Sequence, residues 1–194
     1  MKIIAFGTLK GGTGKTTVAY NVGGILAEEH KVLFVDMDPQ ANLSDNAGID
    51  TTDQTGATIR DVFADPHHTK AEDVIPPAPM WQLPKLDIIA SHIRLTATEL
   101  HLVAVAGRER IIQKWVERNR AKLEEYDYII LDLPPVGEVG DAMAVAKLTD
   151  GMLLVVRQNY CNRLALSAAV RQFFDGVQFL LRACDLFLSS ALIL

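Results

Sequence analysis

The sequence predicts an α/β protein, a doubly wound and mostly parallel β-sheet with helices on both faces, in one domain covering residues 1–194. Three observations lead to this fold class. Short, continuously apolar runs alternate with segments of helical periodicity, as expected where strands are buried on both faces. A glycine-rich loop separates the first apolar run from the first helical segment. The length lies within the roughly 100–200 residues of a typical single domain.

The apolar runs define five expected strands and the helical spacing defines four expected helices. The strands are expected at residues 2–6, 31–36, 86–90, 126–132 and 151–156, and the helices at 16–30, 57–64, 97–122 and 138–148. Because strands and helices alternate, the strands should pair in parallel through right-handed crossovers. The segment 44–85, which contains several prolines, is expected to form loops around the 57–64 helix.

The last residues, about 170–194, are atypical for such a domain. Their even hydrophobicity is compatible with a closing helix, a partner surface or the end of a truncated or altered reading frame. The stretch 177–194 contains Arg182 and Asp185 and falls short of the ~20 apolar residues of a membrane span. We therefore expect no stable membrane insertion.

Composition places the chain among ordinary globular proteins. The hydrophobic share is 49% and the net charge is −5, so the whole chain carries no global signal for nucleic acid, although a local basic patch remains compatible with it. Cys161 and Cys184 have no metal-ligand spacing and indicate a reducing compartment. The N-terminus lacks the apolar region of a signal peptide. These features predict a cytoplasmic protein.

The glycine-rich loop KGGTGKTT follows a predicted strand and opens a predicted helix. Glycines let the backbone curl around an anion, and the helix start offers unpaired N–H groups and a favourable dipole. In such a loop Lys15 reaches the β- and γ-phosphates, and the Thr16 hydroxyl ligates Mg²⁺. A glycine-rich turn without a ligand is the alternative. The residues predicted to bind the nucleotide are Lys10, Gly11, Gly12, Thr13, Gly14, Lys15, Thr16 and Thr17.

One position departs from the usual phosphate-loop pattern, since Leu9 stands where glycine is expected and is followed by Lys10. The stretch resembles the deviant Walker A loop of the ParA/MinD family of P-loop ATPases. That resemblance implies ATP and Mg²⁺ as cofactors. It also implies that Lys10 reaches across a nucleotide-sandwiched homodimer to the partner's phosphates. A Lys10 that is merely solvated remains the alternative.

Carboxylates follow two of the predicted strands at the edge where ligands bind in open α/β sheets. The stretch VLFVDMDPQANLS resembles the DxDPQxN segment of the ParA branch, which implies that Asp36 lies near Mg²⁺ and that Asp38 positions the attacking water. Both could instead be helix caps or loop residues. Asp132 ends the strand at 126–132 and fits the Walker B role of holding Mg²⁺ through water. Leu133 departs from the threonine or cysteine usual in the family.

Taken together, the resemblance implies a ParA-type ATPase of DNA partition or chromosome segregation, with Lys10, Lys15 and Asp38 as catalytic residues. It implies ATP-dependent dimerisation, nonspecific DNA binding that places the protein on the nucleoid, and a centromere-binding or other partner that stimulates hydrolysis. Basic residues for DNA recur in two sets, and a solvated helix face also explains the first set. They are Arg108, Arg110, Lys114, Arg118, Arg120 and Lys122, and then Arg157, Arg163, Arg171 and Arg182.

Two related functions remain open from the sequence. Residues 134–166 also resemble the bacterial capsule-synthesis tyrosine kinases, but the tail has no tyrosine and the kinase loop lacks the equivalent of Lys10. A MinD-like positioning ATPase would need a basic amphipathic C-terminal helix, which the evenly apolar tail does not provide. The adenine-contacting residues are not assigned.

Overall fold

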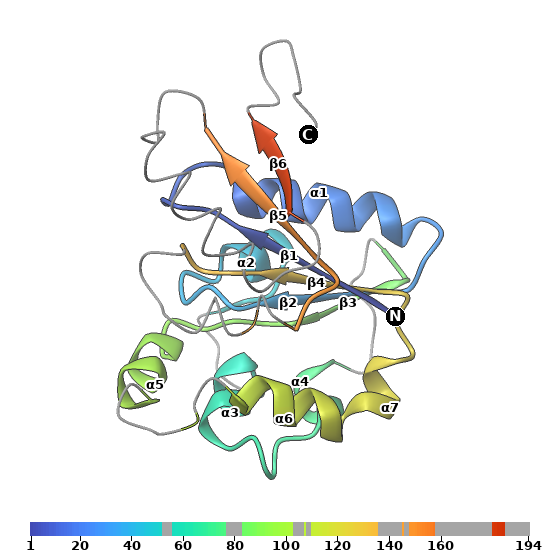
Figure 1. The fold of residues 1–194 in the computed structure, drawn as a ribbon. Coiled ribbons are helices and arrows are strands. Elements are labelled where there is room, and N and C mark those ends of the chain that lie inside the picture. The colour runs from blue at the N-terminus through green and yellow to red at the C-terminus, as the bar shows by residue number, and fades with distance from the viewer. Residues whose placement is uncertain are drawn as a thin grey trace.

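The computed structural model describes residues 1–51, 56–76, 83–102, 107, 110–135, 145, 148–157 and 180–184, with only the backbone described for Glu99, Leu102 and 180–184. Its centre is a six-stranded sheet with the strand order β3-β2-β4-β1-β5-β6 (Figure 1). All neighbouring strands pair in parallel. The strands are β1 Lys2–Gly7, β2 Val32–Asp36, β3 Leu86–Ile89, β4 Tyr128–Asp132, β5 Gly151–Val156 and β6 Leu180–Cys184.

The five expected strands are confirmed as β1 to β5, with ends that differ by up to two residues. The sixth strand, β6, was not expected, because the tail was interpreted as a closing helix, a partner surface or the end of a truncated or altered reading frame. It extends the sheet beyond β5, with Met152 paired to Leu180. The other residues of the tail lie outside the described part of the chain.

Helices cover both faces of the sheet, which confirms the doubly wound arrangement (Figure 1). Helix α1 (Lys15–Ala27) and the short α2 (Asn42–Asn46) pack on one face. Helices α3 (Ile59–Ala64), α4 (Ala71–Val74), α6 (Ile111–Arg118) and α7 (Arg120–Leu123) pack on the other, and α5 spans Leu95–Leu102. Side chains alternate along a strand, so neighbouring residues of β2 belong to different cores. Phe34 packs in the core under α1 and α2, while Leu33 and Val35 pack in the core under α3, α4, α6 and α7.

The expected long helix at 97–122 is wrong, because the structure divides this stretch into α5, α6 and α7. Gly107, between α5 and α6, has φ 81°, a conformation that glycine adopts without steric cost and that ends a right-handed helix. Asn119 separates α6 from α7, and its side chain accepts the Ala71 N–H and donates to the Trp115 carbonyl. The break between α6 and α7 thus lies at a residue whose side chain forms a tertiary hydrogen bond with Ala71.

The remaining helix predictions have mixed outcomes. The helix at 57–64 is confirmed as α3, which starts with a capping box between Thr58 and Asp61. Helix α4 lies within a stretch expected to be loop. The helix expected at 138–148 falls mostly outside the described residues. Within the described part of the chain, no helix is long and apolar enough to cross a membrane.

Candidate active site

The glycine-rich loop connects β1 to α1 and is held in shape by its own threonines. The buried Thr8 hydroxyl lies 2.9 Å from the Lys10 carbonyl oxygen and 2.8 Å from the Thr13 hydroxyl oxygen. Gly12 and Gly14 have φ values of 75° and 87°, which residues with side chains rarely adopt. Gly14 is also the N-cap of α1. The loop therefore ends at a helix N-terminus, where backbone N–H groups favour an anion.

Lys15 lies at the centre of a cluster of polar side chains, of which Lys15, Asp38 and Asp132 are almost fully buried. Its Nζ donates a hydrogen bond to Asp132 Oδ1 at 2.5 Å and lies 3.6 Å from Asp38 Oδ2. The Thr16 hydroxyl donates to the other oxygen of Asp132 at 2.7 Å. The structure thus brings together Lys15, Thr16, Asp38 and Asp132, which come from α1 and from the ends of β2 and β4.

Asp36 is next to this cluster but is held by different partners. One carboxylate oxygen accepts the Asp38 N–H at 3.1 Å, and the other accepts the Ser44 N–H and hydroxyl at 2.9 and 2.8 Å. Burial, and then the nearby Asp132 carboxylate, raise the pKa of Asp36 to about 7, against the opposing effect of the hydrogen bonds from Ser44 and Asp38. Burial likewise raises the pKa of Asp132, while the Lys15 ammonium opposes that rise.

Ser44 is a site residue to which the sequence interpretation gave no role. Its hydroxyl donates to Asp36 and accepts the N–H of Ser91, so it joins the end of β2 to the segment after β3. Ser44 is fully buried in α2, eight residues after Asp36. The feature of the sequence that could have indicated this role is a serine near the start of a short helix that directly follows the DxDPQ stretch.

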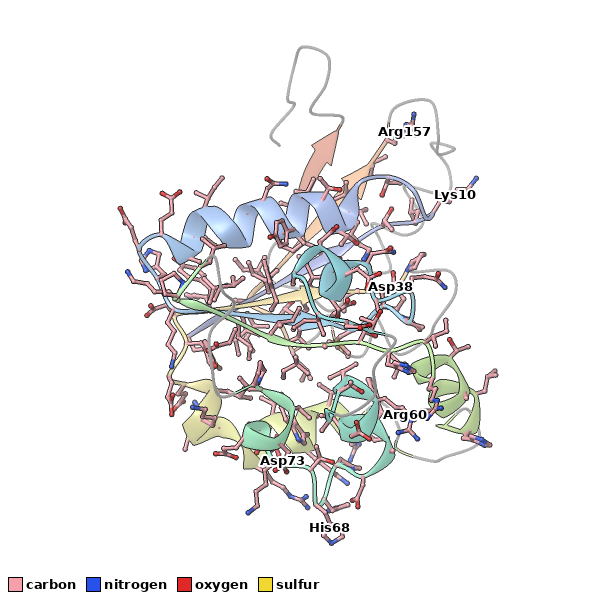
Figure 2. All side chains as sticks on the ribbon, turned by 180° about the vertical axis from the view of Figure 1, so that it is seen from behind. Lys10, Asp38, Arg60, His68, Asp73 and Arg157 are labelled. Carbon is pink, nitrogen blue, oxygen red and sulfur yellow. The ribbon has the colours of Figure 1, made fainter. Side chains whose placement is uncertain are left out.

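Lys10 lies apart from the Lys15 cluster. It is exposed, and its side chain extends outward from the loop (Figure 2). Gly7 of β1 pairs with Leu154 of β5, and Lys10 and Arg157 each follow their paired residue by three positions. Both therefore leave the sheet at the carboxyl edge of the strands. A role of Lys10 toward a second copy of the chain stays a prediction.

The acidic residues fit a magnesium ion that is held only partly by protein. In the part of the chain that the structure describes, no group of three or more His, Cys, Asp or Glu side chains is placed to hold a metal. Mg²⁺ commonly keeps several waters and binds one or two carboxylates together with substrate phosphates. Thr16 and Asp132, which share a hydrogen bond, suit that mode. Asp36 as a metal-site residue stays a prediction.

The burial of Asp36 leads to an expected pH dependence of stability. Its pKa is about 7 in the folded chain and 3.8 for an ordinary exposed aspartate, so the folded protein binds this proton more tightly than the unfolded chain does. The stabilising contribution is therefore present in full below about pH 4 and is lost as the pH rises to 7. At about 1.4 kcal/mol for each pH unit, it is worth up to about 4 kcal/mol.

The measurement is urea unfolding of the nucleotide-free protein at pH 5 and pH 8 in the presence of a chelator. Asp36→Asn should lose less stability over this range than the parent, because its amide keeps an acceptor for Ser44 and has no proton to release. Glu125→Gln, which changes an exposed carboxylate, is the control and should follow the parent. The same loss of stability with pH in Asp36→Asn and the parent would contradict the assignment.

The basic residues considered for DNA are partly engaged with neighbours. Trp115, on the inner face of α6, is buried. On the outer face Arg118 donates to the Pro66 carbonyl and contacts His67. Arg120 and Lys122 form ion pairs with the glutamates that follow them, Glu124 and Glu125. Arg108, Arg163 and Arg171 lie outside the described residues. This surface is therefore less basic than its sequence suggests.

Comparisons with known proteins show the family of the chain. A family model described as an AAA domain matches residues 1–182. The chain is 38% identical over 135 residues to the sporulation initiation inhibitor protein Soj of Bacillus subtilis, which covers 69% of this chain and 50% of Soj. It is 35% identical over 136 residues to the chromosome partitioning protein ParA of Caulobacter vibrioides, covering 70% and 48%. The chain thus spans about half the length of these curated relatives.

A solved structure shares the fold at low sequence identity. The cobyrinic acid a,c-diamide synthase from Mycobacterium smegmatis, with a bound ATP analog and magnesium, superimposes with a TM-score of 0.80. The match covers 98% of this chain and 77% of the synthase at 22% identity. It confirms the doubly wound α/β fold.

Proposed function

The chain belongs to the AAA-domain family as a ParA-type P-loop ATPase, and from this we propose that it is an ATP-dependent dimerisation switch in DNA partition. In this proposal it binds ATP with Mg²⁺, dimerises, binds DNA and hydrolyses ATP when a partner protein stimulates it. It acts in the cytoplasm, on the nucleoid in the ATP state. The relatives named for chromosome partitioning support the cellular role.

One observation carries the proposal, namely the position of Lys15 among Asp132, Asp38 and Thr16. Lys15 is the only lysine or arginine that is buried among the described residues, and its partners are two carboxylates at the edge of the sheet. Phosphate oxygens compete with these carboxylates for its ammonium. Bound Mg²⁺ would offset the charge of the phosphates and carboxylates. The glycine-rich loop then holds the phosphates through its N–H groups.

Asp38 is the proposed water-positioning residue. Its Oδ1 accepts the Gln40 N–H at 3.0 Å, which fixes the carboxylate in the turn after β2. Its Oδ2 faces the Lys15 ammonium at 3.6 Å, next to the place where the terminal phosphate would be bound. A carboxylate in this position can orient a water molecule and accept its proton as the phosphate is attacked.

Lys10 is the proposed link between nucleotide binding and dimerisation. It is exposed and its side chain extends outward from the loop, whereas Lys15 is buried. One ammonium leaves most of the negative charge of a triphosphate uncompensated. A second ammonium delivered from another copy of the chain makes the dimer dependent on ATP. Without the phosphates, no negative charge attracts the Lys10 ammonium to the facing site.

DNA binding in the proposal uses phosphate contacts without reading bases, so it needs clustered exposed cations. The ion pairs of Arg120 and Lys122 reduce the contribution of α7. The exposed Arg157, which leaves the sheet at its carboxyl edge, becomes a candidate beside Lys114. A dimer presents each of these residues twice, which links DNA binding to ATP.

The test is to measure the mass of the protein in solution with ADP and with ATP, and then to repeat both with duplex DNA of random sequence. We expect a monomer with ADP and a dimer with ATP, with DNA retained only by the dimer. DNA binding should weaken steeply with salt. A plot of the logarithm of the binding constant against the logarithm of the salt concentration should have a slope of about −0.9 for each neutralised phosphate. Phosphate release, measured in parallel, should be slow and should follow the presence of Mg²⁺.

Each outcome bears on a different part of the proposal. A dimer that forms equally with ADP and ATP would exclude the switch. Tight, salt-insensitive binding to one DNA sequence would contradict phosphate-based recognition. A dimer that forms only with ATP but does not bind DNA would support the dimerisation switch and exclude DNA as its partner.

A further inference from the structure

A chain of hydrogen bonds leads to the turn that carries Asp38, the proposed water-positioning residue. It begins at the backbone N–H of Ser91, which donates to the Ser44 hydroxyl at 2.9 Å. That hydroxyl donates to Asp36 Oδ2 at 2.8 Å, and the Ser44 N–H donates to the same oxygen at 2.9 Å. Asp36 Oδ1 then accepts the Asp38 N–H at 3.1 Å. The chain therefore links the segment after β3 to Asp38.

The direction of these hydrogen bonds is set by the first donor. A backbone N–H can only donate, so the Ser44 oxygen accepts from Ser91 and its own proton is directed to Asp36. Hydrogen bonds that run in one direction polarise one another in a low-dielectric interior, which strengthens each of them. Ser44 and Asp36 are 0% exposed and Ser91 is 1% exposed. Removing the Ser44 hydroxyl would therefore take away the acceptor of one buried group and a donor to another.

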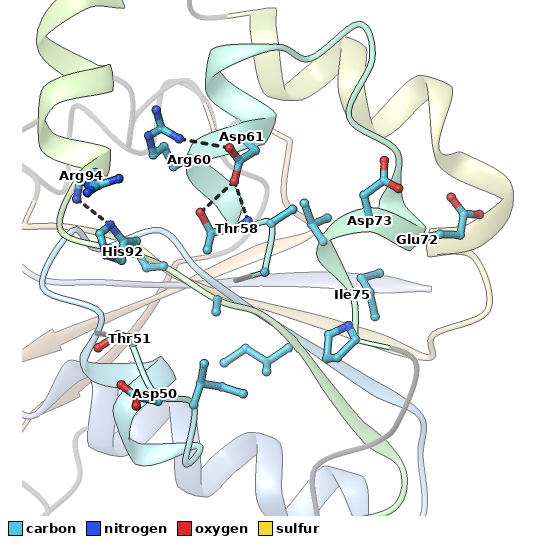
Figure 3. Close-up of a pocket in the computed structure, with 18 residues that line it drawn as sticks. Asp50, Thr51, Thr58, Arg60, Asp61, Glu72, Asp73, Ile75, His92 and Arg94 are labelled. Carbon is cyan, nitrogen blue, oxygen red and sulfur yellow. Dashed lines mark hydrogen bonds and ion pairs between the residues drawn. The ribbon is translucent and has the colours of Figure 1, made fainter. Parts of the chain in front are cut away.

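The segment that supplies the Ser91 N–H is itself held in place. It borders the cavity shown in Figure 3, where the Arg94 N–H donates to His92 Nδ1 at 3.0 Å. The Leu95 N–H, at the start of α5, donates to the His92 carbonyl at 2.8 Å. Leu95 is fully buried in the core, so this end of α5 is anchored. The first donor of the chain thus belongs to a fixed part of the fold.

The turn at the other end of the chain contains a strained residue. Ala41 has φ 54° and is the only non-glycine residue with a positive φ in the part of the chain that the structure describes. This conformation costs free energy for an alanine and persists where the surrounding structure determines it. The Ala41 N–H donates to the Asp38 carbonyl at 2.9 Å, and the Gln40 N–H donates to Asp38 Oδ1 at 3.0 Å. The backbone around Asp38 is therefore held in one particular shape.

Asp36 suits its place in the chain because a carboxylate accepts hydrogen bonds at both oxygens. One oxygen is used for Ser44 and the other for Asp38. An asparagine has a single side-chain oxygen and an amide group that only donates. It could therefore keep the contact to Ser44 or the contact to Asp38, but not both.

We propose that Ser44 and Asp36 are positioning residues for ATP hydrolysis, which hold Asp38 through its backbone N–H in the orientation that directs the attacking water. The inference rests on the proposed role of Asp38 and extends it to two buried residues behind the turn. It differs from the metal-site role that the sequence predicts for Asp36, because holding the Asp38 N–H requires no contact with Mg²⁺. Its consequence is a change in the rate of hydrolysis without a change in binding.

The test compares Ser44→Ala with the parent at pH 8. Phosphate release at saturating ATP and Mg²⁺ should be about 10–100-fold slower, since a small misplacement of a group that directs a reactant has effects of this size. The affinities for Mg²⁺ and for a non-hydrolysable ATP analogue, measured by calorimetry, should equal those of the parent. In the nucleotide-free protein, NMR should show faster hydrogen exchange at the Ser91 and Asp38 N–H groups. Asp36→Asn should likewise slow hydrolysis without weakening Mg²⁺ binding.

Further variants separate positioning from a general loss of stability. Leu43→Val shortens a fully buried side chain of the same helix, α2, and should hydrolyse ATP like the parent. Ser44→Ala/Asp38→Asn should be no slower than Asp38→Asn alone, because Ser44 acts through Asp38. Ser44→Cys replaces the hydroxyl with a weaker donor and serves if Ser44→Ala fails to fold.

The outcomes distinguish this inference from the proposed function. Hydrolysis at the parent's rate in Ser44→Ala, together with slow hydrolysis in Asp38→Asn, would overturn the inference and leave the proposed function intact. Hydrolysis at the parent's rate in Asp38→Asn would overturn the role of Asp38 and the inference with it. Weaker Mg²⁺ binding in Asp36→Asn would assign that carboxylate to the metal instead. An equal loss of rate in Leu43→Val, or additive losses in the double variant, would reduce the role of Ser44 to stability alone.

Discussion

Lys15→Ala is expected to abolish ATP binding. The Lys15 ammonium is the one buried cation among the described residues and the group placed to meet the β- and γ-phosphates. A hydrogen bond to a charged group is worth about 1.5–3 kcal/mol, and Lys15 would make more than one, so the affinity should fall at least about 100-fold. Calorimetric titration with ATP and Mg²⁺ measures the change directly.

The same substitution is also expected to reduce stability, which the sequence alone does not suggest. Asp132 is fully buried and loses the ammonium 2.5 Å from its Oδ1. Removing one partner of a buried pair costs about 3–5 kcal/mol where the other charge stays uncompensated. Reduced ATP binding in Lys15→Ala therefore needs to be separated from partial unfolding.

A second substitution separates the two effects. Lys15→Ala/Asp132→Asn removes both charges, so it should recover much of the stability seen by urea unfolding while ATP binding stays lost. Lys31→Ala, which removes an exposed lysine paired with Glu125, is the control and should bind ATP normally. Normal ATP affinity in Lys15→Ala would remove the phosphate-loop assignment. Recovery of ATP binding in the double variant would mean that instability, and not the lost ammonium, caused the defect.

The loop and the strand ends were predictable from the sequence because their signals are local. The stretch GGTGKTT between an apolar run and a helical segment specifies a phosphate loop through glycine conformation and the helix start. Asp36 and Asp132 each end an apolar run, and parallel strands bring their carboxyl ends to one edge. The structure confirms this edge, since Asp36 and Asp132 are paired in register on β2 and β4.

The contacts within the site were not predictable, because they depend on the strand order. Strand β4 lies between β2 and β1, and this order places Asp132 against Lys15 although 117 positions separate them in the chain. Ser44 holds Asp36 through a short helix that has little periodicity to detect. The break between α6 and α7 likewise lies at Asn119, whose side chain accepts the N–H of Ala71, 48 positions away in the chain.

Asp38→Ala and Lys10→Ala are expected to fail in different ways, which tests the switch itself. If Asp38 positions the attacking water, its loss should slow ATP hydrolysis by about 10²–10⁴-fold while ATP still binds, and the ATP-bound dimer should persist. Lys10 is exposed and stands apart from the Lys15 cluster. Lys10→Ala should therefore bind ATP as a monomer and fail to dimerise. Phosphate release and the mass in solution with ATP distinguish the two variants.

Matched substitutions connect each defect to the proposed chemistry. Asp38→Asn keeps an acceptor for the Gln40 N–H and so preserves the turn, yet it removes the carboxylate and should be as slow as Asp38→Ala. Lys2→Ala removes an exposed lysine at the other end of β1 and should dimerise like the parent. Dimerisation of Lys10→Ala at the parent's ATP concentration would exclude Lys10 as the contact to the second copy. Normal turnover in Asp38→Asn would show that hydrolysis does not need this carboxylate, because the turn that holds it is intact.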